Sequence, residues 1–143
     1  MTETYLEQKA RQRKELENFP IFFAFSEDQF EEGLKKFGMT EHDKNLLTRV
    51  PGGGFIRTAD AEKFVDMVIR HVEEFTAACE ADTTGEVGGF LFQAFNYELA
   101  NHEYICNYDV TPALNALGLT MEQINERPAM VNALALAKQD QHA

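Results

Sequence analysis

The sequence predicts a mainly helical α+β fold, in which about five to six helices pack with a small antiparallel sheet or hairpin. Several segments have the apolar spacing of helices and open with Ser, Thr or Pro, which are common at helix starts. Two short runs, NLLTRV and GFIRT, flank a P-G-G-G turn and predict the hairpin. With 143 residues, 44% of them hydrophobic, the chain is expected to form a single globular domain over residues 1–143.

The first part of the chain is predicted to form two helices separated by a strand. An exposed helix is expected from Glu3 to Asn18, at the periphery of the domain, because this segment is rich in helix formers and ends before a proline. The apolar run PIFFAFS predicts a buried strand from Ile21 to Phe25. Ser26 opens the capping-box pattern S-E-D-Q, which predicts a helix from Glu27 to Phe37 that ends at Gly38.

The P-G-G-G turn could also be a phosphate-binding loop, because successive backbone amides can hold an anion. No G-K-[ST] follows it, however, and Phe55 to Arg57 has the composition of a strand. The hairpin is therefore the better interpretation. Thr40 is expected to cap a short helical turn through Asp43 before the hairpin begins.

A long helix is predicted from Ala59 to about Ala81, with Thr58 as its cap. We expect an apolar stripe of this helix to face the core, consisting of Phe64, Met67, Val68, His71, Val72 and Phe75. A histidine on such a stripe is usually a packed core residue. The H-x-x-E spacing of His71 and Glu74 also leaves a metal-ligand role open.

ADTTGEVGG has the composition of a loop, and the following GFLFQAFNYELANHEY is the most apolar helix candidate in the chain. This helix is expected to lie at the centre of the fold, with one inward face made of Leu91, Phe92, Phe95, Leu99 and His102. The segment YICNY then predicts a short strand.

The carboxyl-terminal part predicts three short helices. Thr111 and Pro112 open the first, which ends at Gly118. Thr120 to Gln123 repeats the capping-box pattern before a helix near residues 121–125, and a last helix is expected from Pro128 to about residue 138. The first two resemble a helix-turn-helix, but their acidic side chains would be repelled by phosphates, so we interpret them as a helical hairpin of the core.

Charge is unevenly distributed along the chain, whose net charge is −11. Residues 1–70 hold eleven Lys or Arg and thirteen Asp or Glu, whereas residues 71–126 hold ten acidic residues and no Lys or Arg. Such a segment repels nucleic-acid phosphates and attracts basic surfaces. We therefore expect no direct nucleic-acid binding. A protein partner is expected to be basic.

The chain has no apolar run long enough to cross a membrane, and its start is acidic, unlike a secretory signal. Cys79 and Cys106 lack C-x-x-C spacing and are expected to be reduced thiols. These features predict a cytoplasmic protein without membrane contact. The sequence predicts no cofactor.

Five phrases together resemble a known family: FPIFFAFSEDQFEEGLKKFG, GGGFIR, ADTTGE, YELANHEY and LNALGLT. They occur in the same order in an uncharacterised family of short acidic proteins of gut anaerobic bacteria, often associated with conjugative or other mobile elements. The similarity spans roughly residues 19–119. It implies a bacterial cytosolic setting, and it implies no reaction and no catalytic residues.

The phrase YELANHEY contains the most chemistry-like spacing in the chain, because Glu98 lies one helical turn before His102. Three site chemistries are open. The pair could act in acid–base catalysis, or His102 could activate Cys106 as a nucleophile. A metal site is the third, with ligands drawn from His71, Glu74, Glu98, His102 and Glu103. Against all three, a core histidine hydrogen-bonded to Glu98 explains the spacing without a substrate.

The leading hypothesis is a non-enzymatic interaction or accessory protein that engages a basic partner through an acidic surface, or that forms a homo-oligomer. H-E-x-x-H, G-x-S-x-G and Walker-type motifs are missing, so an enzyme is less favoured. The alternatives are a small metal- or thiol-dependent enzyme built around Glu98 and His102, and a nucleic-acid-mimicking inhibitor.

Overall fold

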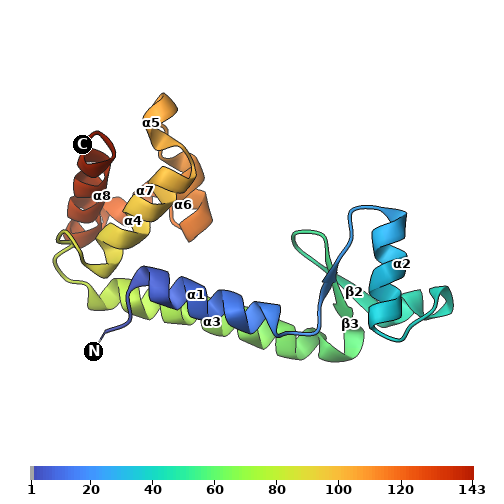
Figure 1. Cartoon of the computed structure of the whole chain (residues 1–143). Coiled ribbons are helices and arrows are strands. Elements are labelled where there is room, and N and C mark those ends of the chain that lie inside the picture. Colours follow the sequence, from blue (N-terminus) through green and yellow to red (C-terminus); the bar gives the residue numbers. More distant parts are fainter. Residues whose placement is uncertain (1) are drawn as a thin grey trace. The chain divides into compact units, whose positions relative to one another are not determined.

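The computed structural model describes residues 2–143 and confirms the mainly helical α+β fold (Figure 1). In chain order the elements are α1 (Tyr5–Glu17), β1 (Phe22–Phe23), α2 (Glu27–Lys36), the 3-10 helix η1 (Glu41–Leu46), β2 (Leu47–Val50), β3 (Gly54–Arg57), the 3-10 helix η2 (Thr58–Asp60), α3 (Ala61–Ala81), α4 (Phe90–Asn101), α5 (Tyr104–Asn107), α6 (Thr111–Leu117), α7 (Met121–Asn125) and α8 (Pro128–Gln141).

The chain divides into two compact units. One consists of the residues up to Arg11 together with Glu73–Ala143, and we call it the helical unit. The other consists of Gln12–Val72, and we call it the sheet unit because it contains all three strands. Both divisions fall inside helices, within α1 and within α3. The expectation of one domain over residues 1–143 stays a prediction.

The sheet unit is built around an antiparallel sheet with the strand order β1-β3-β2. The predicted hairpin is confirmed, since β2 and β3 pair across the turn with Arg49 opposite Phe55. The predicted strand from Ile21 to Phe25 is present but limited to Phe22–Phe23. It ends there because the next segment leads directly into the cap of α2, where Ser26 accepts the amide of Gln29.

Aromatic rings hold α2 on the sheet. The ring of Phe22 lies 5.0 Å from that of Phe37 and 5.3 Å from that of Phe55, measured between centroids. Gly33 lies over Phe22, where a Cβ atom would come within 2.0 Å of the ring. The absence of a side chain at this position therefore allows α2 to approach the strand closely.

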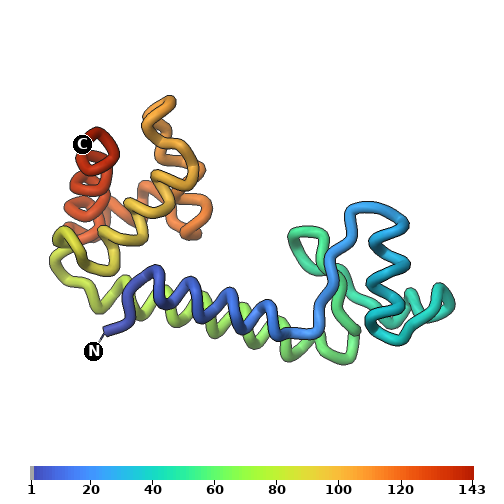
Figure 2. Tube along the Cα trace, in the orientation of Figure 1, coloured from blue at the N-terminus to red at the C-terminus, as the bar shows by residue number. Residues whose placement is uncertain are grey.

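Helix α4 is the central element of the helical unit and contacts α5, α6 and α8. Figure 2 shows α8, at the red end of the chain, beside the yellow α4. The buried side chains of α4 are Phe90, Leu91, Ala94, Phe95, Glu98 and Leu99. Facing helices contribute mostly small and aliphatic residues, among them Ala133 and Ala137, which are both 0% exposed. Small residues at these positions let two helices approach closely.

The predicted strand at YICNY is wrong, because this segment forms the single-turn helix α5. Glu103 adopts a left-handed conformation with φ of 54° and ends α4, after which the chain turns into α5. The sequence contains no glycine or proline at this break that would have indicated it. The predicted caps of the next helices are confirmed at Gly118, which is left-handed, and at Thr120, which forms the capping box with Gln123.

The ADTTGEVGG loop is organised by Asp82. Its Oδ1 accepts the amides of Gly85 at 2.9 Å and Thr84 at 3.2 Å, and its Oδ2 accepts the amide of Leu91 at 3.0 Å in the first turn of α4. Arg127 holds the same loop by donating to the carbonyls of Cys79 and Asp82, both at 3.0 Å. The ADTTGE phrase thus has a structural role in starting α4.

Helices α1 and α3 lie side by side and run in opposite directions (Figure 1). Gln8 donates to the carbonyl of Glu74, and Gln12 donates to the carbonyl of His71. Further along, Glu15 contacts Nε2 of His71 at 2.6 Å and also pairs with Arg70. The expected exposed helix at residues 3–18 is therefore present as α1, although Tyr5 and Gln8 are buried.

Candidate functional site

Glu98 is the most buried ionisable side chain of the described residues, with 1% of its surface exposed. It lies on α4 next to Leu99 in the core of the helical unit. His102 is exposed, at the end of the helix, with 34% of its side chain accessible. The prediction of an inward-facing His102 is therefore wrong. α4 buries the carboxylate one turn earlier, because the helix ends at Asn101 and its last residues lie beyond the core.

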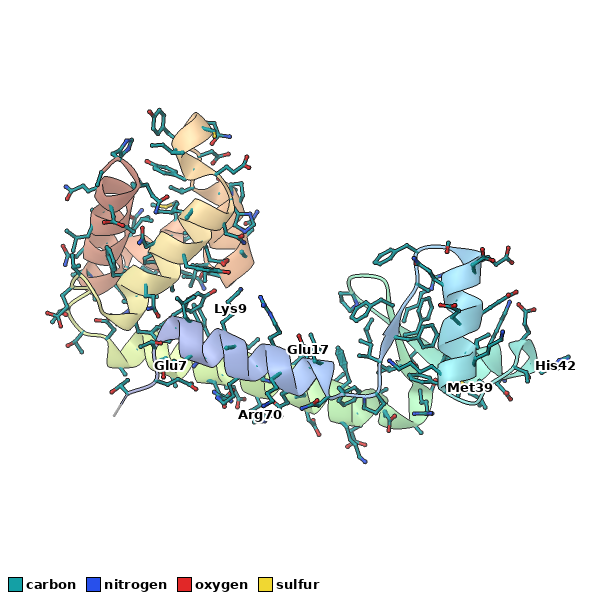
Figure 3. All side chains as sticks on the ribbon, viewed as in Figure 1. Glu7, Lys9, Glu17, Met39, His42 and Arg70 are labelled. Carbon is teal, nitrogen blue, oxygen red and sulfur yellow. The ribbon has the colours of Figure 1, made fainter. Side chains whose placement is uncertain are left out.

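Lys9 of α1 provides the charge that compensates Glu98. Figure 3 labels Lys9 on α1. Its Nζ lies 3.6 Å from Oε1 of Glu98 and also lies over two aromatic rings, 5.8 Å from the centroid of Tyr5 and 5.5 Å from that of Tyr97. The side chain of Lys9 remains 35% exposed. The ammonium thus contacts both the carboxylate and two aromatic rings, an arrangement in which cation–π contact and ion pairing act together.

Two features show how strongly burial acts at this site. Burial raises the pKa of the Tyr5 phenol well above its ordinary value, and the nearby Glu98 carboxylate raises this pKa further. Oε1 of Glu98 accepts no hydrogen bond from any residue in the described part of the chain. A buried carboxylate without a full set of donors is costly, and the ion pair with Lys9 offsets part of this cost.

Glu98 and His102 do not form a hydrogen bond with each other. His102 Nε2 lies 4.0 Å from Oε2 of Glu98, beyond hydrogen-bonding distance. Cys106 is exposed on α5, in a separate helix from His102. The acid–base and thiol roles of Glu98, His102 and Cys106 stay predictions.

The candidate metal ligands contact different partners and do not all come together. His71 meets Glu15, Glu74 forms an ion pair with Arg11 at 3.1 Å, and Glu103 is exposed at the end of α4. Within residues 2–143, no three His, Cys, Asp or Glu side chains come together as a metal site would require. A metal role for these residues stays a prediction.

A second candidate site is an apolar stripe on the outside of α3. Val65, Val68, Ile69 and Val72 are 55%, 44%, 50% and 59% exposed, and we call them the valine stripe. Their spacing places them on one face of the helix. The prediction that Val68 and Val72 face the core is wrong, whereas Phe64 and Met67 are buried as expected. Apolar residues occupy a wider arc of α3 than the sheet unit covers.

Carboxylates border the valine stripe. Glu62 and Asp66 are exposed and lie three residues before Val65 and Ile69, which places each beside the stripe on the helix surface. Arg70 pairs with Glu15 of α1. The stripe is therefore apolar along its middle and negative along one border.

The two units differ in charge. The helical unit holds thirteen Asp or Glu and four Lys or Arg, whereas the sheet unit holds eleven and nine. Three of the four cations in the helical unit have partners within it: Lys9 meets Glu98, Arg11 meets Glu3 and Glu74, and Arg127 binds backbone carbonyls. Most of the acidic side chains in this unit are therefore not neutralised by its own cations.

A family model described as a family of unknown function, DUF7659, matches residues 4–140. The chain belongs to the DUF7659 family. No curated protein and no solved structure gave a match to the chain. None of the helices formed by residues 2–143 combines the length and apolar character needed to cross a membrane.

The DUF7659 match includes the Glu98 site, the valine stripe and the Asp82 loop. Sequence reasoning missed Lys9 as the partner of Glu98, because the two residues lie far apart in the sequence. The signal that could have found the valine stripe is the width of the apolar arc on α3. Six apolar residues among positions 64–72 exceed what one buried face needs.

Proposed function

We propose that this DUF7659 protein is a non-enzymatic interaction protein that binds an amphipathic, basic helix of a partner protein on the valine stripe. The observation that carries the proposal is the exposure of four β-branched residues at helical spacing on α3. The occupant would insert apolar side chains against the stripe and place Lys or Arg beside Glu62 and Asp66.

Helix propensity supports burial of the stripe in a complex. Val and Ile are poorer helix formers than Ala, Leu, Glu or Lys, because the preceding turn restricts their χ1 rotamers. On a helix surface that stays in water they destabilise the helix without any packing in return. Burial against a partner would provide that packing, at about 25 cal/mol for each Å² of apolar surface removed from water.

Charge supports a basic occupant. The chain carries a net charge of −11, most of it in the helical unit. The stripe lies in the sheet unit, where the exposed Glu62 and Asp66 make its border acidic. A negative field accelerates the encounter with a basic partner and disfavours acidic ones. It also disfavours nucleic acid as the ligand of this surface.

The biological setting is part of the same proposal. The resemblance to short acidic proteins of gut anaerobic bacteria supports a bacterial, cytoplasmic protein that serves as an accessory factor of a conjugative or other mobile element. The partner would then be a basic protein of that element. Homo-oligomerisation and mimicry of nucleic acid are the alternatives that the experiment below separates from it.

Binding of a synthetic amphipathic helix made of leucine and lysine tests the proposal. We expect Val68→Ser/Val72→Ser to weaken binding of this peptide at least about tenfold, since two buried apolar contacts are lost. Glu62→Gln/Asp66→Asn is expected to weaken binding less, and mainly at low salt, where the Debye length is about 10 Å. Fluorescence anisotropy of the labelled peptide measures both effects.

Matched variants control for nonspecific attraction between a basic peptide and an acidic protein. Val87→Ser changes another exposed valine, which is 66% exposed in the loop before α4, and should leave binding unchanged. Equal weakening by Val87→Ser and by the stripe variant would contradict the proposal.

Analytical ultracentrifugation tests homo-oligomerisation. If the wild type forms a dimer and the stripe variant does not, the stripe binds a second copy of the chain and the proposal is contradicted. Binding to a DNA-binding protein in competition with duplex DNA would instead support mimicry of nucleic acid.

A further inference from the structure

The sheet unit contains an aromatic cavity of about 540 Å³. It opens between the start of α2, the 3-10 helix η1 and one face of the sheet. Arg49 and Phe55 are paired across β2 and β3, so their side chains lie on the same face of the sheet. Phe30 reaches this face from α2, with its ring centroid 5.1 Å from that of Phe55. This volume lies within the range of small-molecule sites.

Phe25 forms a wall of the cavity although 77% of its surface is exposed. Its ring lies against Gly53, where a Cβ atom would come within 2.4 Å of Cε1, and Gly53 has a φ of 84°. Only glycine adopts that backbone conformation readily and leaves room for the ring. Two separate phrases of the sequence, FFAFS and PGGG, therefore meet at the cavity and hold an exposed aromatic ring in place.

Two cations reach the cavity over its aromatic rings. The guanidinium of Arg49 lies 5.6 Å from the centroid of Phe55, and Nζ of Lys44 lies 5.7 Å from that of Phe30. Lys44 also pairs with Glu41 at 3.3 Å, which neutralises part of its charge. Arg49 is exposed, and a guanidinium that contacts a ring can still donate hydrogen bonds to a ligand. The carboxylates of Glu27 and Glu41 also line the cavity, and Glu41 is the partner of Lys44.

We propose that this cavity binds a small aromatic carboxylate. The ring of the ligand would lie among Phe25, Phe30 and Phe55, where aromatic pairs are favourable beyond simple burial. The carboxylate would meet Arg49, whose planar fork binds carboxylates through two parallel hydrogen bonds. This site is independent of the partner helix proposed above, because it uses other residues and another class of ligand.

A series of three probes with one ring and different end groups tests the proposal: 3-phenylpropionate, 3-phenylpropanamide and 2-phenylethylamine. Titrations followed by amide NMR signals of β2, β3 and α2 should show saturable binding of the acid with a Kd of about 1 mM or lower. The amide and the amine should bind at least about tenfold more weakly, because neither provides a carboxylate for Arg49.

Variants separate the charge from the aromatic wall. Arg49→Gln should weaken binding of the acid about tenfold and leave binding of the amide unchanged, which also shows that the cavity remains folded. Phe25→Ala should weaken both probes. The matched control is Phe23→Ala, a neighbouring phenylalanine that is 48% exposed and does not line the cavity; it should change neither affinity.

Three results would overturn the assignment. The first is equal affinity for the acid, amide and amine, which would mean that the cations take no part. The second is equal weakening by Phe23→Ala and Phe25→Ala. The third is tenfold tighter binding of a peptide that ends in a free phenylalanine carboxylate, which would assign the cavity to a chain terminus in place of a small acid.

Discussion

Replacement of Asp82 by alanine is expected to lower the free energy of unfolding of the helical unit by about 3 kcal/mol, since hydrogen bonds to a charged group contribute about 1.5–3 kcal/mol each and are not additive. The variant removes the acceptor of three backbone amides, those of Thr84, Gly85 and Leu91. It leaves the first turn of α4 without its carboxylate cap. Urea unfolding followed by far-UV circular dichroism measures the loss.

The same variant should change the acid sensitivity of the protein. Burial of Asp82 acts to raise its pKa, but hydrogen bonds from Gly85, Leu91 and Thr84, aided by Arg127, outweigh burial, so the pKa is lowered. A carboxylate with a lowered pKa stabilises the fold above its unfolded pKa of about 3.9, and this contribution is lost as the pH falls through the folded pKa. Asp82→Ala should therefore lose less stability than the wild type between neutral and strongly acidic pH.

Asp109→Ala is the matched control for Asp82→Ala. Asp109 also accepts an amide, that of Thr111 in the first turn of α6, but it is exposed and its backbone acceptor role is limited to that one amide. Its replacement should cost clearly less stability. Equal losses from the two variants would show that Asp82 acts as an ordinary surface cap and does not organise the loop.

The second large effect is expected at Lys9. Lys9→Met should destabilise the helical unit by about 2–3 kcal/mol, below the 3–5 kcal/mol typical of breaking a fully buried pair, because Lys9 is partly exposed. The cause is the Glu98 carboxylate, which would stay buried without its compensating charge. Adding Glu98→Leu removes that carboxylate and should return stability to within about 1 kcal/mol of the wild type.

A double-mutant cycle with Lys9→Met, Glu98→Leu and the combined variant measures the coupling of the two residues. Lys9→Arg, which keeps the charge, is the control and should cost less than Lys9→Met. A combined variant less stable than Lys9→Met alone would contradict the account. It would mean that Glu98 depends mainly on other neighbours, such as Tyr5 or His102.

Local signals made much of the fold predictable. The capping box at Thr120, the left-handed Gly118 and the P-G-G-G turn each determine conformation within a few residues, and the structure contains all three. The break after α4 is different: Glu103 adopts a left-handed conformation, and the next residue, Tyr104, is buried in the core. No local residue preference indicates such a break.

The candidate site was less predictable, because burial depends on partners far away in the sequence. Helical spacing placed His102 with Phe95 and Leu99, yet it could not show that α4 ends at Asn101 and leaves His102 exposed. It also could not show that Lys9 compensates Glu98. The α3 pattern was misleading for a related reason: apolar spacing identifies an apolar face of a helix, and it does not distinguish a buried face from an exposed one.

The division into two units affects the order in which contacts can form during translation. Translation completes residues 12–72 of the sheet unit while most of the helical unit has yet to be made. Tyr5, Gln8 and Lys9 leave the ribosome before the rest of the helical unit, yet their contacts with Phe90, Glu74 and Glu98 form only after the later helices emerge. The helical unit therefore cannot complete its packing until residues made after the sheet unit can contact the turn of α1 made before it.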